Sequence, residues 1–276
     1  MDEPWDYLNG LVSKSVWIIR EAKAQFKNTG VLWSMGKDST AMLYLIKKAL
    51  EEAPFKVIHI DNGNEFKECY EFKRKVQQEL NLDIITKRSI IKQDEISGLS
   101  CCGANKTDAL KEVIKENEFD SIIVSIRWDE HGIRGLERYF SPRDKEFRWN
   151  LYNPDKGEHG EALQDAEFVG WGITVSDFGD CDHVRIHPLL HWREIDVWRF
   201  IKQENIPVNT LYFPRNGKRF RSLGCKSCTV AVESPASNLD EIITELETTS
   251  VKERAGRAES KEETYIMQRL RALGYM

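Results

Sequence analysis

Short apolar segments alternate with longer amphipathic segments along the first half of the chain, and this alternation restricts the possible folds most strongly. Runs rich in isoleucine, valine and leucine predict buried strands in four places: residues 31–33, 56–61, 82–87 and 121–126. Helical patterns lie in the intervals between them. Short strands that alternate with helices form a parallel sheet with helices on both faces. We therefore predict an α/β fold built on a doubly wound parallel sheet.

The flanking segments extend this pattern at both ends. A helical pattern precedes the first strand and stops at the Asn-Thr-Gly of residues 28–30. From about residue 140 the chain becomes rich in turn-forming and charged residues, which is typical of a long excursion over a site. Further helices are predicted at 192–204, 238–248 and 260–273. We assign residues 1–205 to the α/β domain and residues 206–276 to a C-terminal extension of mostly helical or irregular structure.

The charge balance limits the kinds of partner. The 276 residues include 45 acidic and 40 basic side chains, which gives a formal charge of −5. This charge argues against a free-standing nucleic-acid binder that depends on neutralising phosphates, although it permits a local basic groove. No apolar run approaches the roughly 20 residues of a membrane span, and the acidic start MDEPWDYLNG lacks the apolar core of a signal peptide. We expect no membrane contact and a cytoplasmic location.

The stretch SMGKDS, residues 34–39, lies directly between the first predicted strand and the helix that follows it. Gly36 would allow a tight turn, and the amides at a helix N-terminus favour an anion. Lys37 would neutralise phosphate charge, and Asp38 could hold Mg²⁺ through oxygen. The alternative is an ordinary strand-to-helix turn with a polar cap. The candidate phosphate-binding residues are Ser34, Gly36, Lys37, Asp38, Ser39 and Thr40.

This loop resembles the pyrophosphate loop (PP-loop) of the ATP pyrophosphatases, which cleave ATP between the α and β phosphates and adenylate a substrate. Six further blocks resemble the small subunit of bacterial sulfate adenylyltransferase and the phosphoadenylyl-sulfate reductases: HIDNGNEFKECYEF, NKTDALK, SIRWDEHGIRGLERYFSPRD, HPLLHWREIDVW, RFRSLGC and AVESPASNLDEII. The resemblance implies an adenine nucleotide α-hydrolase-like fold with ATP and Mg²⁺ as ligands. It implies that the loop holds the β and γ phosphates, that Asp61 lies near the nucleotide and that Arg127 faces the α phosphate.

A physical argument also supports a catalytic role for Arg127. It follows the fourth predicted strand, and a fixed guanidinium there would stabilise the charge that develops at the α phosphate during nucleophilic attack. A surface arginine is the alternative. We take Lys37, Asp38 and Arg127 as the candidate catalytic residues. A later basic segment could contact an oxyanion or form a solvated loop, and its cations are Arg215, Lys218, Arg219 and Arg221.

Two cysteine pairs suggest a metal centre. Cys101 and Cys102 are adjacent, and Cys225 and Cys228 form a C-x-x-C pair. Close-spaced cysteines in a reducing compartment indicate metal or redox chemistry, and four thiolates can bind zinc or a [4Fe-4S] cluster. An adjacent pair suits zinc less well, and the arrangement resembles the cluster pattern of iron–sulfur adenylyl-sulfate reductases. We expect a [4Fe-4S] cluster on these four residues, with zinc, a redox pair or unligated thiols as alternatives.

Other possible ligands and bases do not stand out. The histidines show no ligand spacing and are assigned to packing or to the surface: His59, His131, His159, His183, His187 and His191. No cysteine follows Cys228, so reduction through a cysteine in a C-terminal tail is not expected.

An adenylating loop, a cluster and no such tail together resemble the ATP pyrophosphatase component of bacterial DNA phosphorothioation, of the DndC and SspD type. The resemblance implies that ATP adenylates a phosphate for sulfur insertion, that a partner cysteine desulfurase donates sulfur, and that other phosphorothioation proteins present the DNA. The first alternative is sulfate adenylyltransferase, which joins sulfate to the α phosphate of ATP, releases pyrophosphate, and needs a GTPase partner but no cluster. The second alternative is a non-catalytic iron–sulfur scaffold.

Overall fold

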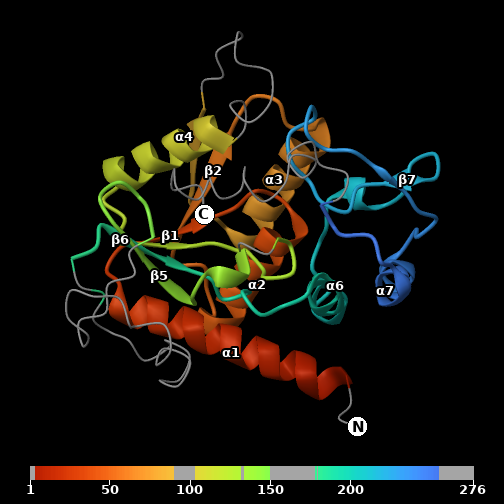
Figure 1. The fold of residues 1–276 in the computed structure, drawn as a ribbon, viewed down its shortest axis with the longest axis horizontal. Helices are drawn as coiled ribbons and strands as arrows, with labels where there is room; N and C mark the ends of the chain where they lie inside the picture. The colour runs from red at the N-terminus through yellow and green to blue at the C-terminus, as the bar shows by residue number, and fades with distance from the viewer. Residues whose placement is uncertain (1–3, 90–102, 132–133, 150–177, 179, 255–276) are drawn as a thin grey trace.

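A six-stranded sheet forms the centre of the computed structural model, which describes residues 4–89, 103–131, 134–149, 178 and 180–254 (Figure 1). The strand order is β3-β2-β1-β4-β6-β5. The bounds are β1 (Thr29–Leu32), β2 (Lys56–Asp61), β3 (Ile84–Arg88), β4 (Ser121–Ile123), β5 (Phe140–Arg143) and β6 (His183–Ile186). Strands β3, β2, β1, β4 and β6 run parallel, and β5 pairs antiparallel with β6 at one edge. The predicted doubly wound α/β fold is confirmed.

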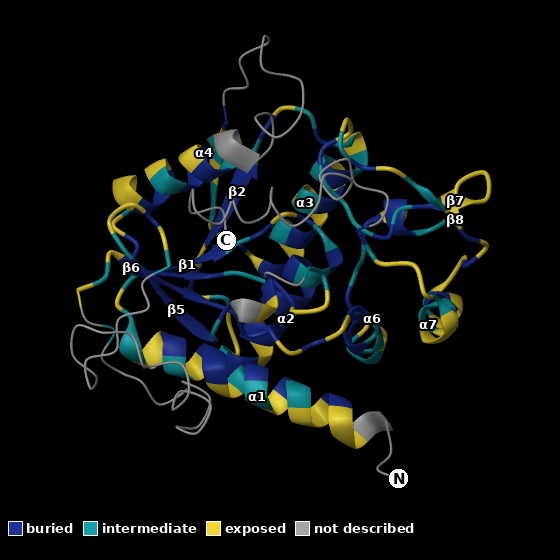
Figure 2. Ribbon diagram, viewed as in Figure 1, coloured by how far each residue is buried: buried dark blue, intermediate teal, exposed yellow. Residues whose placement is uncertain are grey.

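Helices cover both faces of this sheet. Their bounds are α1 (Pro4–Gln25), α2 (Lys37–Leu50), α3 (Lys67–Leu80), α4 (Gly103–Glu116), α6 (Glu194–Gln203) and α7 (Leu239–Thr248). The larger apolar cluster joins one face to α1, α2, α3 and α6, while a smaller one joins Ile58, Ile60 and Ile122 to α4 on the other face. Figure 2 shows most of the sheet as buried, although the edge strand β3 is only partly buried. No helix among the described residues is long and apolar enough to cross a membrane.

The C-terminal extension packs onto the α/β domain. It contains a two-stranded antiparallel sheet of β7 (Lys218–Arg219) and β8 (Val232–Glu233), followed by α7, which contacts α6. Leu211, Tyr212 and Ile242 belong to the larger apolar cluster. The division of the chain at residue 205 stays a prediction, because the two parts share that core.

The sequence prediction missed two strands of the main sheet, β5 and β6, and misplaced some ends. Strand β5 contains Pro142, which suggested a loop, but an edge strand tolerates a residue without an amide hydrogen. Helix α1 ends at Gln25, so the predicted stop at residues 28–30 includes the start of β1. The predicted helix at 260–273 lies outside the described residues.

Replacing Gly30 by alanine should destabilise the fold by about 1–3 kcal/mol, because overpacking a dense core forces neighbours to move. A Cβ on Gly30 would lie 2.7 Å from Cδ1 of Ile58 and 3.0 Å from Cδ1 of Ile122. Gly10 is the control, since it is exposed on α1 and a Cβ added there would have no atom within 4 Å, and Gly10→Ala should stabilise the protein by about 0.5–1 kcal/mol. Urea unfolding measures both changes. A Gly30→Ala protein as stable as the parent would contradict this packing.

Candidate functional site

The loop between β1 and α2 turns at Met35 rather than at Gly36. Met35 has a left-handed φ of 59°, while Gly36 has φ −77° and ψ 167°, which any residue can adopt. The expectation that Gly36 makes the tight turn is therefore wrong. A Cβ on Gly36 would lie 3.5 Å from Ser34 Oγ and from Tyr212 Oη, which is ordinary contact. The glycine instead leaves the space above the N-terminus of α2 open.

Hydroxyl groups hold the loop in this shape. Ser39 Oγ accepts a hydrogen bond from the Ser34 amide (3.2 Å) and donates one to the Gly36 carbonyl (3.2 Å). The Lys37 amide donates to Tyr212 Oη at 2.8 Å. These bonds fix the start of α2, whose amide dipoles favour an anion.

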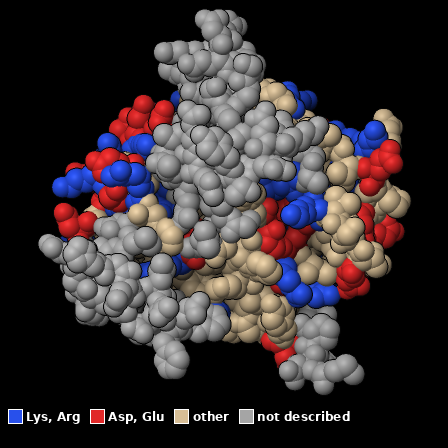
Figure 3. Space-filling view, viewed as in Figure 1, with Lys and Arg blue, Asp and Glu red and all other residues tan. Residues whose placement is uncertain are grey.

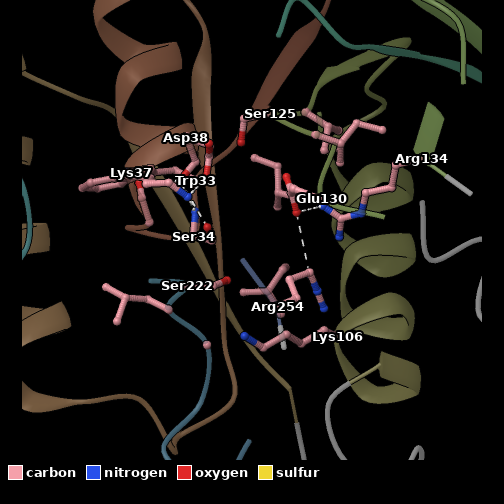
Figure 4. Close-up of a pocket in the computed structure, with 18 of the residues that line it drawn as sticks. Trp33, Ser34, Lys37, Asp38, Lys106, Ser125, Glu130, Arg134, Ser222 and Arg254 are labelled. Atoms are coloured by element: carbon pink, nitrogen blue, oxygen red, sulfur yellow. Dashed lines mark hydrogen bonds and ion pairs between the residues drawn. The ribbon is translucent and has the colours of Figure 1, made fainter. Parts of the chain in front are cut away.

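A cavity lies at the carboxyl ends of β1, β2 and β4, where an open parallel sheet usually binds its ligand (Figure 4). Five predicted phosphate-binding residues line it: Ser34, Gly36, Lys37, Asp38 and Ser39. The sixth, Thr40, does not line it, because its hydroxyl is buried and accepts a hydrogen bond from Trp33 Nε1 at 3.1 Å. Thr40 therefore supports the loop from behind.

The opposite walls carry basic residues that are not among the site residues predicted from the sequence. Lys106 comes from α4, Arg134 from the segment after β4, and Arg254 from the C-terminal extension (Figure 4). Glu130 lies between the two arginines, accepts a short hydrogen bond from Arg134 and lies 3.7 Å from Arg254 Nη1. Lys106 lies in the NKTDALK block, and that block was the signal that could have marked it. The extension thus completes a cavity that the α/β domain begins.

Two buried cations converge on one carboxylate at this cavity. Lys37 is 1% exposed and Arg127 is fully buried, and both make short contacts with the carboxylate of Glu253. Both cations also contact the Asp38 carboxylate, and the distance from Lys37 Nζ to Asp38 Oδ2 is 3.0 Å. Burial alone would favour the neutral acid, but Lys37 and Arg127 outweigh it and hold the pKa of Glu253 far below its usual range. Glu253 is therefore an anion held by two cations at the N-terminus of α2.

Arg127 follows β4 as predicted, yet it does not line the cavity. The side chains of Asp38 and Glu253, which do line it, both contact the Arg127 guanidinium, and Asp129 Oδ1 lies 3.0 Å from its Nε. Burial opposes its charge, but Glu253, Glu130 and the neighbouring carboxylates raise the pKa of Arg127 further. The guanidinium is thus a permanent cation at the back of the site.

Asp61 ends β2 and is held by two donors. Its Oδ1 accepts hydrogen bonds from the Gly63 amide (2.7 Å) and from Tyr70 Oη (2.8 Å). Burial opposes ionisation, but these bonds outweigh it and lower the pKa of Asp61. Asp61 is not among the residues that line the cavity, although its neighbours Ile60 and Glu65 are.

The C-x-x-C pair forms a turn beside the cavity. The Cys228 amide donates to the Cys225 carbonyl at 3.1 Å, and Gly224, one residue earlier, lines the cavity. The Lys226 amide donates to the Asn64 carbonyl at 2.8 Å, which joins this turn to the loop after β2. Cys101 and Cys102 lie outside the described residues, so the four-cysteine cluster stays a prediction.

The sequence suggests that the basic segment of residues 215–221 could contact an oxyanion. Most of its cations are paired with carboxylates. Arg219 and Arg221 are buried and contact Glu245 and Glu194, at 2.6 Å each. None of the four cations, Arg215 and Lys218 included, lines the cavity. Arg219 pairs with Glu245 within the extension, whereas Arg221 and Arg215 join the extension to Glu194 of α6 and Glu68 of α3.

Comparison with known proteins identifies the family. Residues 28–231 match the phosphoadenosine phosphosulfate reductase domain. The chain belongs to this family. Within the phosphoadenosine phosphosulfate reductase family, it is 33% identical to sulfate adenylyltransferase subunit 2 of Marinomonas sp. (strain MWYL1) and 34% identical to that of Saccharophagus degradans. Each match covers 98% of this chain and 97% of the relative, so the predicted resemblance to the sulfate adenylyltransferase subunit is confirmed.

Solved structures show the same fold at low sequence identity. Candida glabrata FMN adenylyltransferase in complex with FAD and pyrophosphate has a TM-score of 0.58 and 16% identity, covering 91% of this chain and 88% of that protein. The phosphoadenylyl-sulfate reductase of Candida auris has a TM-score of 0.51 and 14% identity, covering 83% and 99%. The predicted adenine nucleotide α-hydrolase-like fold of this phosphoadenosine phosphosulfate reductase family member is thus confirmed.

Proposed function

We propose that this protein transfers the adenylyl group of ATP to sulfate and releases pyrophosphate. The convergence of Lys37 and Arg127 on the Glu253 carboxylate carries the adenylyl-transfer part, because cations at a helix N-terminus form a site for phosphate oxygens. The choice of sulfate rests on the full-length similarity to sulfate adenylyltransferase subunit 2. This choice was the first alternative of the sequence prediction, and it now has more support than the main prediction.

In this mechanism the β and γ phosphates take the place of the Glu253 carboxylate. The loop of residues 34–39 and Lys37 hold them, and Arg127 acts on the α phosphate once Glu253 has moved aside. An oxygen of sulfate attacks the α phosphorus, the bond to the β phosphate oxygen breaks, and pyrophosphate leaves. The Asp38 carboxylate is 17% exposed and lines the cavity, so it fits as an oxygen ligand for the Mg²⁺ that accompanies ATP and shields its charge.

Sulfur insertion into DNA is the second candidate, and the position of the C-x-x-C turn favours it. Cys225 is buried directly after Gly224, which lines the cavity. This function requires a cysteine desulfurase, other phosphorothioation proteins and DNA presented by them, whereas sulfate activation requires a GTPase partner. In Figure 3 the described acidic and basic side chains are mixed on the face shown, which suits DNA binding through partners better than direct binding.

The test compares two acceptors under anaerobic conditions. With ATP, radiolabelled sulfate and a GTPase subunit from a bacterial sulfate adenylyltransferase, we expect pyrophosphate and labelled adenylyl sulfate in equal amounts. Labelled sulfur that passes from cysteine into DNA, only when a desulfurase and partner proteins are added, would support the second candidate instead. Failure to release pyrophosphate in either mixture would support the iron–sulfur scaffold.

Replacing Cys225 by serine tests the cluster separately. If the four cysteines hold a [4Fe-4S] cluster, the parent should contain about four irons and four sulfides per chain, and Cys225→Ser should lose most of them while keeping basal ATP cleavage. Cys181→Ser is the matched control, because Cys181 is partly exposed outside the cavity and its loss should leave metal content unchanged. Iron, zinc and acid-labile sulfide are measured on protein purified without oxygen. Unchanged metal in Cys225→Ser would exclude Cys225 as a ligand.

A further inference from the structure

Three side chains with metal-binding atoms meet where β2 ends. His59 and Asp61 are two residues apart on β2, so both project from the same face of the strand, and Glu65 follows in the turn before α3. One ligand atom from each residue lies within 4.8 Å of the other two. His59 Nε2 and Glu65 Oε2 are 3.8 Å apart, a distance that two ligands about 2.1 Å from one cation can span.

The two most buried members of this group have unsatisfied polar atoms. His59 is 1% exposed, and neither of its ring nitrogens forms a hydrogen bond of ordinary geometry with a described residue, although the Trp33 backbone lies close to the ring. Glu65 Oε2 is also buried without a hydrogen-bond partner among the described residues. It lies 3.8 Å from His59 Nε2, too far for a hydrogen bond. Buried polar atoms of this kind need an explanation, because each costs about 1–3 kcal/mol.

The charges around the group are compatible with a cation. Burial and Lys73 lower the pKa of His59 to about 4, so the ring is neutral at pH 7 and offers a lone pair. The donors Gly63 and Tyr70 share Asp61 Oδ1 and fix that carboxylate. Lys106 Nζ lies 3.5 Å from Glu65 Oε1, which leaves Oε2 directed at the histidine. Burial raises the pKa of Glu65, so a bound cation would favour its ionised form.

We propose that His59, Asp61 and Glu65 bind one divalent cation through one imidazole nitrogen and two carboxylate oxygens. This ligand set suits Mn²⁺, Fe²⁺ or Zn²⁺ better than Ca²⁺ or Mg²⁺, which prefer oxygen alone. Glu65 also lines the cavity, so the cation would lie at the cavity wall on the side of β2. The site is separate from the phosphate loop, and it does not depend on which acceptor the protein uses.

The experiment titrates Mn²⁺ alone into the full chain after chelation, without nucleotide, and follows free Mn²⁺ by electron paramagnetic resonance. Mn²⁺ binds thiolates poorly, so the cysteine pair contributes little. We expect one Mn²⁺ per chain. Glu65→Gln, which keeps the side-chain volume, should weaken binding about tenfold or more. Glu68→Gln is the matched control, since the Glu68 carboxylate pairs with Arg215 instead, and its affinity should equal that of the parent.

Two further measurements distinguish this site from the phosphate loop. Asp38→Asn should bind Mn²⁺ as the parent does, and spin-echo spectra of the bound ion should show coupling to an imidazole nitrogen that His59→Ala abolishes. Thermal unfolding of Glu65→Gln checks that the variant is folded. Binding that is lost in Asp38→Asn but kept in Glu65→Gln would overturn the proposal, as would failure of the parent to bind Mn²⁺ at millimolar concentration.

Discussion

Replacing Lys37 by alanine should reduce pyrophosphate release from ATP by about 100- to 1,000-fold, the usual cost of removing one charged or hydrogen-bonding group from a transition state. Lys37 has almost no exposed surface and lies at the N-terminus of α2, where the phosphates of ATP are proposed to bind. No other residue of the 34–39 loop can supply an ammonium group. Release of pyrophosphate under saturating ATP measures the effect.

Lys48→Ala is the control for this experiment. Lys48 lies on the same helix, but it is 44% exposed and pairs with Glu204 on the surface, so its removal should leave the rate unchanged. Metal content should be the same in both variants, because neither lysine is one of the four predicted cysteine ligands. Full activity of Lys37→Ala would remove the loop from the mechanism.

Replacing Glu253 by glutamine should have opposite effects on the empty protein and on ATP binding. The amide cannot neutralise Lys37 and Arg127, so the nucleotide-free protein should lose about 3 kcal/mol or more, as when one partner of a buried ion pair is removed. ATP should bind about tenfold more tightly, equivalent to about 1.4 kcal/mol, because its phosphates no longer displace a carboxylate. Urea unfolding and calorimetric ATP titration measure the two effects.

The pH dependence of the stability loss follows from the pKa of Glu253. Because Lys37 and Arg127 lower this pKa in the folded state, the carboxylate stabilises the fold fully above its ordinary value of 4.5. That contribution disappears as the pH falls through the lower folded pKa. The stability difference between the parent and Glu253→Gln should therefore be constant near neutral pH and shrink only in acid.

Glu247→Gln provides the control for Glu253→Gln. Glu247 lies on α7, is about half-exposed and pairs with Arg199, so both stability and ATP affinity should remain near those of the parent. Weaker ATP binding by Glu253→Gln would mean that Glu253 assists the nucleotide instead of competing with it.

The features that the sequence predicted correctly are local in the chain. Strand β2 was predicted with its observed bounds, because its apolar run begins at the charged Lys56 and ends at Asp61 shortly before Gly63. The SMGKDS loop was placed correctly because it follows its strand directly. Met35 was not predicted to be the left-handed residue, because glycine is the usual choice for positive φ and methionine carries no such signal. The backbone there is set by the buried contacts of Met35 and by the hydroxyls of the loop.

The features that were missed depend on residues far apart in the chain. Glu253 reaches Arg127 across 126 positions, and no spacing rule joins them. Arg219 and Arg221 were predicted to lie in a basic loop, because the sequence does not show that their carboxylate partners Glu245 and Glu194 lie nearby in other elements. The cluster of His59, Asp61 and Glu65 is an exception, because its residues are close in the chain. His59 was assigned to packing or to the surface, since the pattern His-x-Asp-x-x-x-Glu becomes a cluster only when the chain bends back after β2.

Because both the α/β domain and the C-terminal extension line the cavity, the cavity is incomplete during most of the protein's synthesis. The loop, the catalytic candidate Arg127 and the sheet are all synthesised within the first 186 residues, whereas Glu253 and Arg254 emerge near the end. While residues 127–252 are being added, a nascent chain therefore carries Lys37 and Arg127 without the Glu253 carboxylate that contacts both. Asp38 and Asp129 are carboxylates that contact these cations during that interval, and a bound anion such as ATP would add counter-charge and favour folding of the growing chain.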